Sequence, residues 1–302
     1  MIIGVMVTET YEKIYHKKLK NLDIDELFKI TKCILNRLLN LNIKCYEFCI
    51  EDSSDLRKLL KVLDKLNYSN ICIQVHDVEN SVKLAYRNPE VREKVLEELF
   101  SIIELASNHG IRIITIHPAY FKPSFTNYEP SRHIEKSLEY CEAFKTMTAN
   151  LKKIASYAAK RKVLLALENM NYFHIEYGKK LVSAHFGRSS EELLQILRAV
   201  NSSALKVAFD VGHANLSYKR PEEFFRKVSK LVVNIHVNNN YGEHDDHNPL
   251  SLGTIDFTKV FTAIAEEGYK GSVIIERPCD KHIEEDVTVL RKIIAEANSS
   301  RS

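Results

Sequence analysis

Residues 163–168 read VLLALE and residues 206–210 read KVAFD, with SEELLQILRAV at 190–200 between them. The two outer segments are short and nearly all apolar, as parallel strands buried on both faces are. The middle segment repeats apolar residues every three or four positions, which predicts an amphipathic helix. A strand, a helix and a second strand in this order predict a parallel pair joined by a right-handed crossover.

The same alternation continues outward in both directions along the chain. Six further apolar runs predict strands, namely IIGVMV (2–7), KCYEFCI (44–50), ICIQVH (71–76), RIITIH (112–117), VVNIHV (232–237) and SVIIE (272–276). Further amphipathic stretches predict helices at 24–40, 88–110, 133–160, 256–268 and 282–298. Eight strands alternating with helices indicate an α/β protein, here a single (β/α)8 TIM barrel over residues 1–302. A doubly wound sheet is the structural alternative, but VTETYEK (7–13) lacks the glycine-rich turn that usually follows its first strand.

Helix boundaries are predicted from the residues that favour them. These are Pro89 and Pro221 at first helical positions, Ser54 and Ser190 at N-caps, and His109-Gly110 at a helix end. Two connections are long, at 118–130 and 169–189. Both leave the carboxyl ends of strands, where the active sites of barrels are built.

Composition narrows the class of protein. The 302 residues carry a net charge of only +3, too balanced to indicate a nucleic-acid partner by charge alone. No apolar run approaches the roughly 18–20 residues of a membrane span, so no membrane association is expected. The N-terminus shows no secretory signal, and the six cysteines are scattered without a CxxC pair. We therefore expect a cytoplasmic protein with reduced thiols.

The last residues of the strands carry the chemistry. Six consecutive strands deliver His76, His117, Glu168, Asp210, His236 and Glu276, and His213 follows Asp210 closely. In a parallel barrel these ends form one ring around the axis, and such a ring of carboxylates and imidazoles is costly to bury. A central cation removes most of that cost. The donor types favour zinc or manganese, with magnesium or cobalt as alternatives, over calcium.

The segment after the seventh strand, residues 236–257, adds further candidate ligands. Asp245 and His247 are two residues apart, so an extended backbone directs both to the same side. With His213 they could hold a second metal ion. Gly253, in SLGTIDF, predicts a tight turn back to the next helix.

Several short motifs lie at these strand ends: IHP (116–118), LEN (167–169), FDVGHANL (209–216), HVNN (236–239), DDHNPLSLGTIDF (245–257) and IIERP (274–278). Together they resemble the xylose-isomerase-like TIM barrel superfamily, over nearly the whole chain. This superfamily contains sugar and sugar phosphate isomerases and epimerases. It also contains the endonuclease IV type of abasic-site nuclease, in AP endonuclease family 2.

The resemblance to the isomerase and epimerase branch implies a single metal ion held by Glu168, Asp210, His236 and Glu276. It also implies that the two glutamates shuttle a proton next to the substrate carbonyl and that His213 assists them. The substrate contacts expected from these motifs are His117, His213, Asn169 and Asn238.

The resemblance to the endonuclease IV branch implies three zinc ions held by nine ligands. The additional ligands match His76, His117, His213, Asp245 and His247. In this branch Glu168 would bridge two ions, and a metal-bound hydroxide would attack phosphorus. Between one and three divalent ions per chain are therefore expected.

Departures from the nuclease pattern favour the isomerase branch. The segment LENMNYFHIEYG (167–178) lacks the small glycine-containing turn usual in endonuclease IV, and DVGHANL replaces its DTCH motif. The acidic Asp246 stands where an arginine would contact phosphate. However, NNNYGEH (238–244) also lacks the arginine that ketose 3-epimerases carry after their seventh strand.

We interpret the chain as an enzyme, a divalent-metal-dependent isomerase or epimerase of a small sugar or sugar phosphate. Proton transfer would proceed through a metal-stabilised enediolate. The alternative is an abasic-site endonuclease with a trinuclear zinc site, for which DNA would be the partner. A third hypothesis is a non-catalytic metal barrel that acts as a binding protein. The chain is expected to form a homodimer. Arg277 directly follows Glu276, and neighbouring strand positions alternate in direction, so its side chain is expected to point away from the site.

Overall fold

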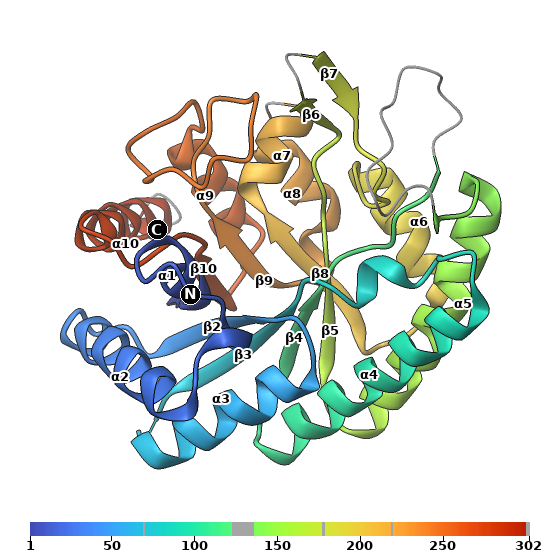
Figure 1. Ribbon diagram of the computed structural model, residues 1–302. Helices are drawn as coiled ribbons and strands as arrows, with labels where there is room; N and C mark the ends of the chain where they lie inside the picture. The colour runs from blue at the N-terminus through green and yellow to red at the C-terminus, as the bar shows by residue number, and fades with distance from the viewer. Residues whose placement is uncertain (69, 123–135, 177–178, 219, 300–302) are drawn as a thin grey trace.

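The computed structural model describes residues 1–68, 70–122, 136–176, 179–218 and 220–299. Eight parallel strands close into a barrel in the order β1-β10-β9-β8-β5-β4-β3-β2 (Figure 1). They are β1 (Ile2–Met6), β2 (Cys45–Ile50), β3 (Cys72–Asp77), β4 (Ile113–Ile116), β5 (Leu164–Glu168), β8 (Leu205–Asp210), β9 (Val232–Val237) and β10 (Ser272–Ile275). All eight predicted strands are confirmed. Closure of the barrel excludes the doubly wound sheet.

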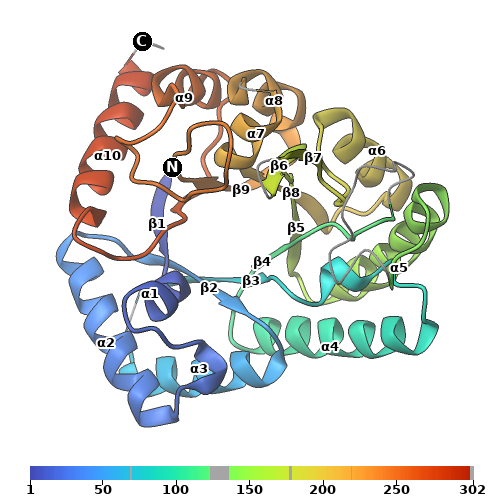
Figure 2. The same cartoon turned by 45° about the horizontal axis from the view of Figure 1, so that its top comes forward.

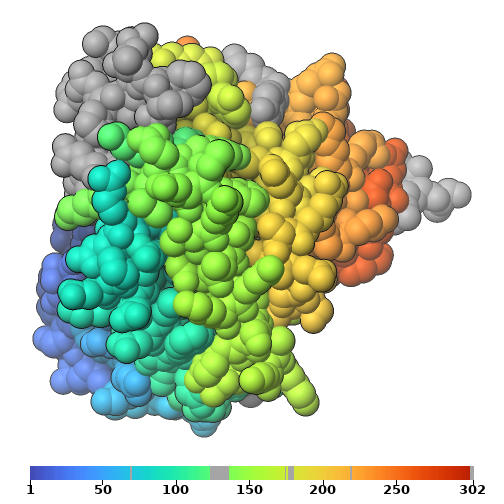
Figure 3. All heavy atoms as spheres, turned by 90° about the vertical axis from the view of Figure 1, so that its right-hand side faces the viewer, coloured from blue at the N-terminus to red at the C-terminus, as the bar shows by residue number. Residues whose placement is uncertain are grey.

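Helices surround the barrel on its outer side (Figure 2). They are α2 (Ile24–Asn40), α3 (Ser53–Leu66), α4 (Pro89–Asn108), α5 (Tyr140–Lys160), α6 (Ser190–Val200), α8 (Pro221–Val228), α9 (Phe257–Glu266) and α10 (Ile283–Ser299). Two short helices, α1 (Thr8–Lys13) and α7 (Val211–Tyr218), follow directly on β1 and β8 at the carboxyl ends of these strands. On the face shown in Figure 3, α4, α5 and α6 lie next to one another, coloured from teal to yellow. None of the described helices combines the length and the apolar character that a bilayer crossing requires.

Most helix boundaries agree with the capping residues, and the differences have local causes. Pro89 and Pro221 occupy first helical positions, and α4 ends before His109-Gly110, where Gly110 has a φ of 74°. The Ser54 prediction was wrong, because the carboxylate of Asp52 accepts the backbone N–H of Asp55 and caps α3 instead. The Ser190 prediction was wrong by one residue, because Ser189 caps α6.

The helix predicted at 133–160 begins later than expected. Its first residues, 133–135, lie outside the described part of the chain. Ser137 and Glu139 form isolated β-bridges with Tyr86 and Lys122, so the backbone enters α5 only at Tyr140. Pairing with distant segments therefore overrides the local helical pattern here.

The two long connections lie at the carboxyl ends of the strands. Residues 123–130 of the 118–130 connection fall outside the described residues. The 169–189 connection contains an antiparallel hairpin formed by β6 (Phe173–Glu176) and β7 (Lys179–Val182). Its strands stand above the barrel beside α7 (Figure 1). The connection therefore adds structure on the side where the strand ends meet.

The barrel wall is apolar, but the barrel interior contains several polar side chains. Apolar residues such as Val75, Leu165 and Ile235 are fully buried between strands and helices. The buried interior polar residues include Glu47, Gln74, Thr115, Asn234 and Ser272, which hydrogen-bond to one another across the barrel. Buried polar groups of this kind must be paired to be tolerated.

Arg277 points away from the barrel axis, as expected from its position after Glu276. Its Nη1 lies 2.6 Å from Asp286 of α10, and its Nη2 lies 2.8 Å from Asp280. Burial raises the pKa of Asp286, although the backbone N–H of Leu250 and the Arg277 guanidinium oppose this shift. The pair therefore joins β10 to α10 at a buried position.

Arg277→Met is expected to lower the free energy of unfolding by about 3–5 kcal/mol, because it leaves the Asp286 carboxylate buried without its partner. Arg226→Met is the matched control. Arg226 pairs with Glu266 on the surface, so its loss is expected to cost about 1 kcal/mol or less. Urea denaturation of both variants makes the comparison, and equal losses would contradict a structural role for Arg277.

Candidate metal centre

The strand ends bring the predicted ligands together. Glu168 and Asp210 are the last residues of β5 and β8, and His236 lies one residue before the end of β9. All three side chains are fully buried, and Asp210 and His236 are register partners on neighbouring strands. Glu276 follows β10 and is 6% exposed. One ligand atom from each of these four residues lies within 4.8 Å of the others.

His236 is the central member of this first group. Its Nδ1 lies 3.3 Å from Oε1 of Glu168 and 3.3 Å from Oε2 of Glu276. Asp210 completes the group, and its carboxylate also accepts the backbone N–H of His213. We call these four residues, Glu168, Asp210, His236 and Glu276, the carboxylate group.

A second group shares Glu168 with the first. His76 of β3 and His117, which follows β4, present Nε2 atoms 2.9 Å apart. Each of these Nε2 atoms lies 3.1 Å from Oε2 of Glu168. Three ligand atoms thus form a nearly equilateral triangle, which we call the histidine triangle. The two oxygens of Glu168 face the two groups separately.

The spacings in both groups fit a bound cation. Ligand atoms at 2.0–2.1 Å from a tetrahedral zinc ion are about 3.3 Å apart, close to the 2.9–3.3 Å distances found here. Among the described residues, Oε2 of Glu168 and Oε2 of Glu276 are buried and face imidazole nitrogens of the candidate ligands at 3.1–3.3 Å. Buried carboxylate oxygens of this kind need a donor or a cation. The residues present therefore fit a divalent metal ion, and the mixed imidazole and carboxylate donors suit zinc or manganese.

The carboxylates of the site carry more negative charge than neutral imidazoles can balance, so protons or a cation are needed to compensate them. Burial opposes ionisation of Glu168, but His236 and His76 outweigh it and hold the pKa of Glu168 well below its usual range. Burial, together with Glu276 and Glu168, raises the pKa of Asp210 well above normal. Burial favours neutral His236, but Glu276, Glu47 and Glu168 raise its pKa well above the usual value. In the absence of a cation, protons on these groups neutralise the carboxylates.

Metal uptake at neutral pH is therefore expected to release protons. His76 and His236 have raised pKa values, so both are protonated in the metal-free protein, whereas a metal ligand must be neutral imidazole. The apparent metal affinity should consequently rise with pH until these imidazoles lose their protons. Calorimetric titration of metal in two buffers of different ionisation enthalpy measures the number released. Uptake with the same heat in both buffers would contradict the expected protonation.

The structure also brings together the third set of predicted ligands. Oδ2 of Asp245 lies 3.2 Å from Nε2 of His213 and 3.4 Å from Nε2 of His247. His213 Nδ1 lies 2.9 Å from the carbonyl oxygen of Asn169 and donates to it, so Nε2 is the nitrogen that faces Asp245. Burial favours the neutral ring, but Asp210 and Asp245 raise the pKa of His213 well above the usual value, and the protonated ring donates to both partners. Asp245 is 35% exposed, so this group opens toward solvent. Asp246 is exposed.

Two asparagines predicted as substrate contacts occupy different situations. The side chain of Asn169 accepts the backbone N–H of Asp210 and donates to its carbonyl oxygen, so it holds β5 against β8. Asn238 donates weakly to Asp210 at 3.5 Å, and its Oδ1 is buried without a hydrogen-bond partner in the described chain. The Oδ1 of Asn238 is packed against Gly212 and closed to solvent, and Asn169 has both its amide atoms engaged, so neither carboxamide oxygen is open to a ligand.

Glycines allow the close approach of the surrounding segments. A Cβ atom on Gly212 would lie 2.2 Å from Oδ1 of Asn238, so α7 can approach β9 only with glycine at this position. A Cβ atom on Gly253 would lie 2.1 Å from Oδ1 of Asn239. The turn predicted at Gly253 is present, and it returns the 239–255 loop to the barrel.

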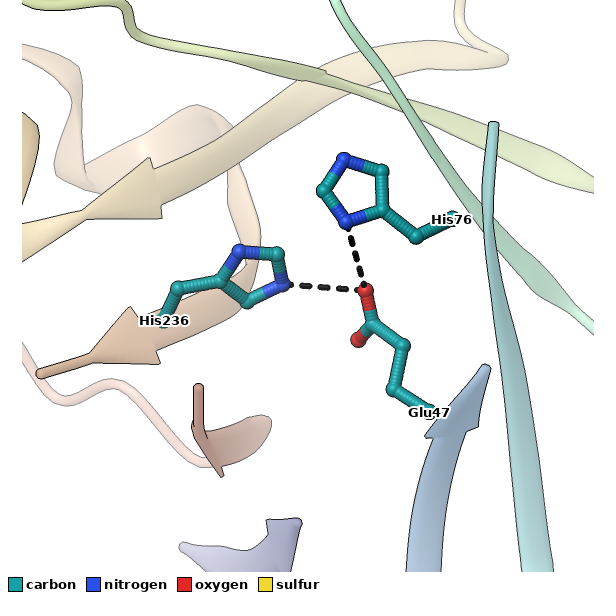
Figure 4. A group of neighbouring side chains, drawn as sticks. All are labelled: Glu47, His76 and His236. Carbon is teal, nitrogen blue, oxygen red and sulfur yellow. Dashed lines mark hydrogen bonds and ion pairs between the residues drawn. The ribbon is translucent and has the colours of Figure 1, made fainter. Parts of the chain in front are cut away.

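Two carboxylates near the site were not predicted. Glu9 of α1 lies 2.6 Å from Nδ1 of His247, and Glu47 of β2 lies beneath His76 and His236 (Figure 4). Glu9 follows the first strand closely. Polar residues that follow parallel strands meet at one side of a barrel, so this position was itself a signal. Glu47 lies in the middle of CYEFCI, and an acidic residue inside an otherwise apolar strand is itself a signal.

Comparisons with known proteins agree with this architecture. The family profile described as "Xylose isomerase-like TIM barrel" matches residues 41–295. The uncharacterised protein MJ1188 of Methanocaldococcus jannaschii is 29% identical over 259 residues, covering 84% of this chain and 86% of that protein. A D-tagatose 3-epimerase-like protein superposes with a TM-score of 0.76 at 22% identity and covers 100% of both chains. An L-ribulose 3-epimerase gives a TM-score of 0.70 at 14% identity, over 100% of this chain and 97% of the other.

Proposed function

Because the chain belongs to the xylose isomerase-like TIM barrel family, we propose that it is a divalent-metal-dependent isomerase or epimerase of a small sugar or sugar phosphate. The observation that carries the proposal is the pair of buried carboxylates, Glu168 and Glu276, on either side of His236 Nδ1. Two carboxylates that flank one site are the arrangement that a proton shuttle requires. Solved structures of sugar epimerases with the same fold support this choice.

The carboxylate group would hold the metal, and its glutamates would move the proton. A bound divalent ion supplies Lewis-acid chemistry, polarising the substrate carbonyl and stabilising the negative charge that develops on its oxygen. In epimerisation one of Glu168 and Glu276 would take the proton from the carbon next to the carbonyl, and the other would deliver a proton to the opposite face of that carbon. In isomerisation one glutamate would carry the proton to the neighbouring carbon while the hydroxyl proton passes to the carbonyl oxygen.

Other side chains would bind the hydroxyl groups of the substrate. His117 and His213 lie on either side of Glu168 and would orient the substrate over it. Asn238 is fully buried and would act on Asp210, whose carboxylate lies 3.5 Å from its Nδ2, rather than touch the substrate. Asn169 would act by positioning Asp210 rather than by touching substrate.

The cysteines are unpaired, which supports an assignment to the reducing cytoplasm.

The test is solvent exchange in deuterium oxide. Metal-loaded protein is incubated with panels of ketoses, aldoses and their phosphates, and NMR follows deuterium at the carbon next to the carbonyl. The expected result is exchange or product formation with at least one member of the panel, lost on Glu168→Gln. Neither exchange nor product with any member would contradict the proposal.

A second candidate is a phosphodiesterase of the abasic-site type. The histidine triangle and the group of His213, Asp245 and His247 favour it, because a site for a single metal ion does not need them. This candidate requires three zinc ions per chain and nicking of a duplex that contains an abasic site, with strongly salt-dependent binding. A content of one ion per chain would contradict it. A metal-binding protein with neither activity would correspond to the non-catalytic hypothesis.

A further inference from the structure

A buried carboxylate inside the barrel, below the strand ends, lies close to ring nitrogens of two candidate metal ligands. Glu47 lies in β2 and is fully buried. Its Oε1 is 3.0 Å from Nε2 of His236 and 3.7 Å from Nδ1 of His76 (Figure 4). In His236 this nitrogen is the one opposite to Nδ1, which faces the carboxylate group. Glu47 therefore lies within hydrogen-bond distance of His236 and at ion-pair distance from His76.

The chemistry of imidazole assigns a role to this contact. A neutral ring carries one N–H donor and one lone pair. If His236 binds metal through Nδ1, which faces Glu168 and Glu276, its hydrogen is on Nε2 and donates to Glu47. His76 presents Nε2 to the histidine triangle, but its Nδ1 lies 3.7 Å from Oε1 of Glu47, beyond hydrogen-bond distance. Glu47 thus accepts the hydrogen of His236 and adds only a nearby charge to His76.

Glu47, His76 and His236 also lie close enough together to hold an ion of their own. An ion there would need the lone pairs of Nδ1 on His76 and Nε2 on His236. A neutral imidazole cannot supply this second lone pair while its other nitrogen binds metal above. The arrangement therefore favours Glu47 as a hydrogen-bond acceptor over a separate metal site in the barrel floor.

A ladder of interior hydrogen bonds holds Glu47 in place. Gln74 Nε2 donates to Ser272 Oγ at 2.8 Å, and Ser272 Oγ donates to Asn234 Oδ1 at 2.7 Å. The Asn234 carbonyl is thereby occupied, so its Nδ2 faces Glu47 Oε2 at 2.8 Å and Thr115 Oγ1 at 3.3 Å. Asn234 Nδ2 also lies 3.0 Å from Nε2 of His236, but both amide hydrogens have oxygen acceptors, so Nε2 need not accept one of them. These hydrogen bonds leave Oε1 of Glu47 for His236.

We propose that Glu47 is a positioning residue, which orients His236 and sets the nitrogen of its ring that carries the hydrogen. This inference rests on the proposed metal site. Carboxylates that accept the second N–H of a metal-bound histidine fix the ring and raise its basicity, and their loss typically lowers metal affinity about 10- to 100-fold.

Zinc titration of the metal-free protein tests the proposal. Glu47→Gln is expected to weaken zinc binding about 10- to 100-fold relative to wild type. Glu98→Gln makes the same chemical change in α4, outside the barrel, and is expected to bind zinc as wild type does. Thermal unfolding of each metal-free variant checks that it folds. Equal affinity of folded Glu47→Gln and wild type would overturn the role of Glu47.

A spectroscopic measurement on the wild type needs no variant to fold. Long-range proton–nitrogen NMR of the zinc-loaded, nitrogen-15-labelled protein reports which ring nitrogen carries hydrogen. The expected result is hydrogen on Nε2 of His236, and hydrogen on Nδ1 of His236 would overturn the proposal. Wild type that takes up no zinc would overturn the metal site and with it the role of Glu47. Zinc binding that Glu47→Gln leaves unchanged would overturn the role of Glu47 alone.

Discussion

Glu168→Gln is expected to lower turnover by about 10³-fold or more, because it removes a proton-transferring carboxylate and a ligand at the same time. Oε1 of Glu168 faces His236, and its Oε2 faces His76 and His117. Glutamine keeps the size of the side chain but replaces one of these oxygens with an N–H donor. Steady-state rates on the substrate found by solvent exchange, with matched measurements of metal content, give the size of the loss.

The control for this substitution is Glu284→Gln, which makes the same chemical change in an exposed pair with Arg37. Its turnover and metal content should match those of the wild type. Glu168→Gln removes a carboxylate whose negative charge His236 and His76 stabilise in the folded protein, so thermal unfolding of the variant is measured beside its turnover to show that it folds. Turnover within tenfold of wild type would contradict a catalytic role for Glu168.

Removal of the metal is expected to lower the thermal midpoint on the order of 10 °C. A ligand present at a thousand times its dissociation constant stabilises the folded state by about 4 kcal/mol. In a chain of this size each kcal/mol corresponds to about 2–4 °C. The carboxylate group supplies the physical cause, because its buried acidic side chains lose their compensating cation. Differential scanning calorimetry before and after chelation measures the change.

Restoring individual metals separates a specific site from a general effect of ions. Zinc or manganese should recover the lost stability, whereas calcium should not, since it prefers oxygen ligands and larger coordination numbers than His236 and its neighbours offer. A thermal midpoint that chelation leaves unchanged would contradict tight metal binding. Equal recovery with calcium would contradict the proposed donor set.

The barrel could be predicted because each of its strands is buried on both faces and therefore appears as a short apolar run. The predicted ligands could be found for a related reason, since polar residues that end such runs meet at one side of a parallel barrel. Helix starts were less predictable where neighbouring residues compete for the N-cap. The sequences Asp52-Ser53-Ser54 and Ser189-Ser190 each offer several oxygen acceptors, and packing selects the earlier one.

The residues that were missed depend on distances that no local pattern contains. Glu47 precedes its strand end by three residues, and its importance appears only when β2, β3 and β9 close around the axis. The hairpin of β6 and β7 was not predicted, because its short strands, FHIE and KKLV, are not the continuous apolar runs that mark the barrel strands. The engagement of Asn169 with the backbone of Asp210 likewise required the contact between β5 and β8. Side chains that act through a partner on another strand therefore cannot be predicted from the residues at the strand ends alone.

The most direct measurement is anomalous X-ray scattering from crystals grown with zinc or manganese, recorded at the absorption edge of the metal. The expected result is a strong peak within ligand distance of Glu168, Asp210, His236 and Glu276. A single peak there would support the isomerase proposal, and three peaks that extend to His76, His117 and Asp245 would favour the phosphodiesterase. Crystals with no peak among these four residues would contradict the metal centre itself.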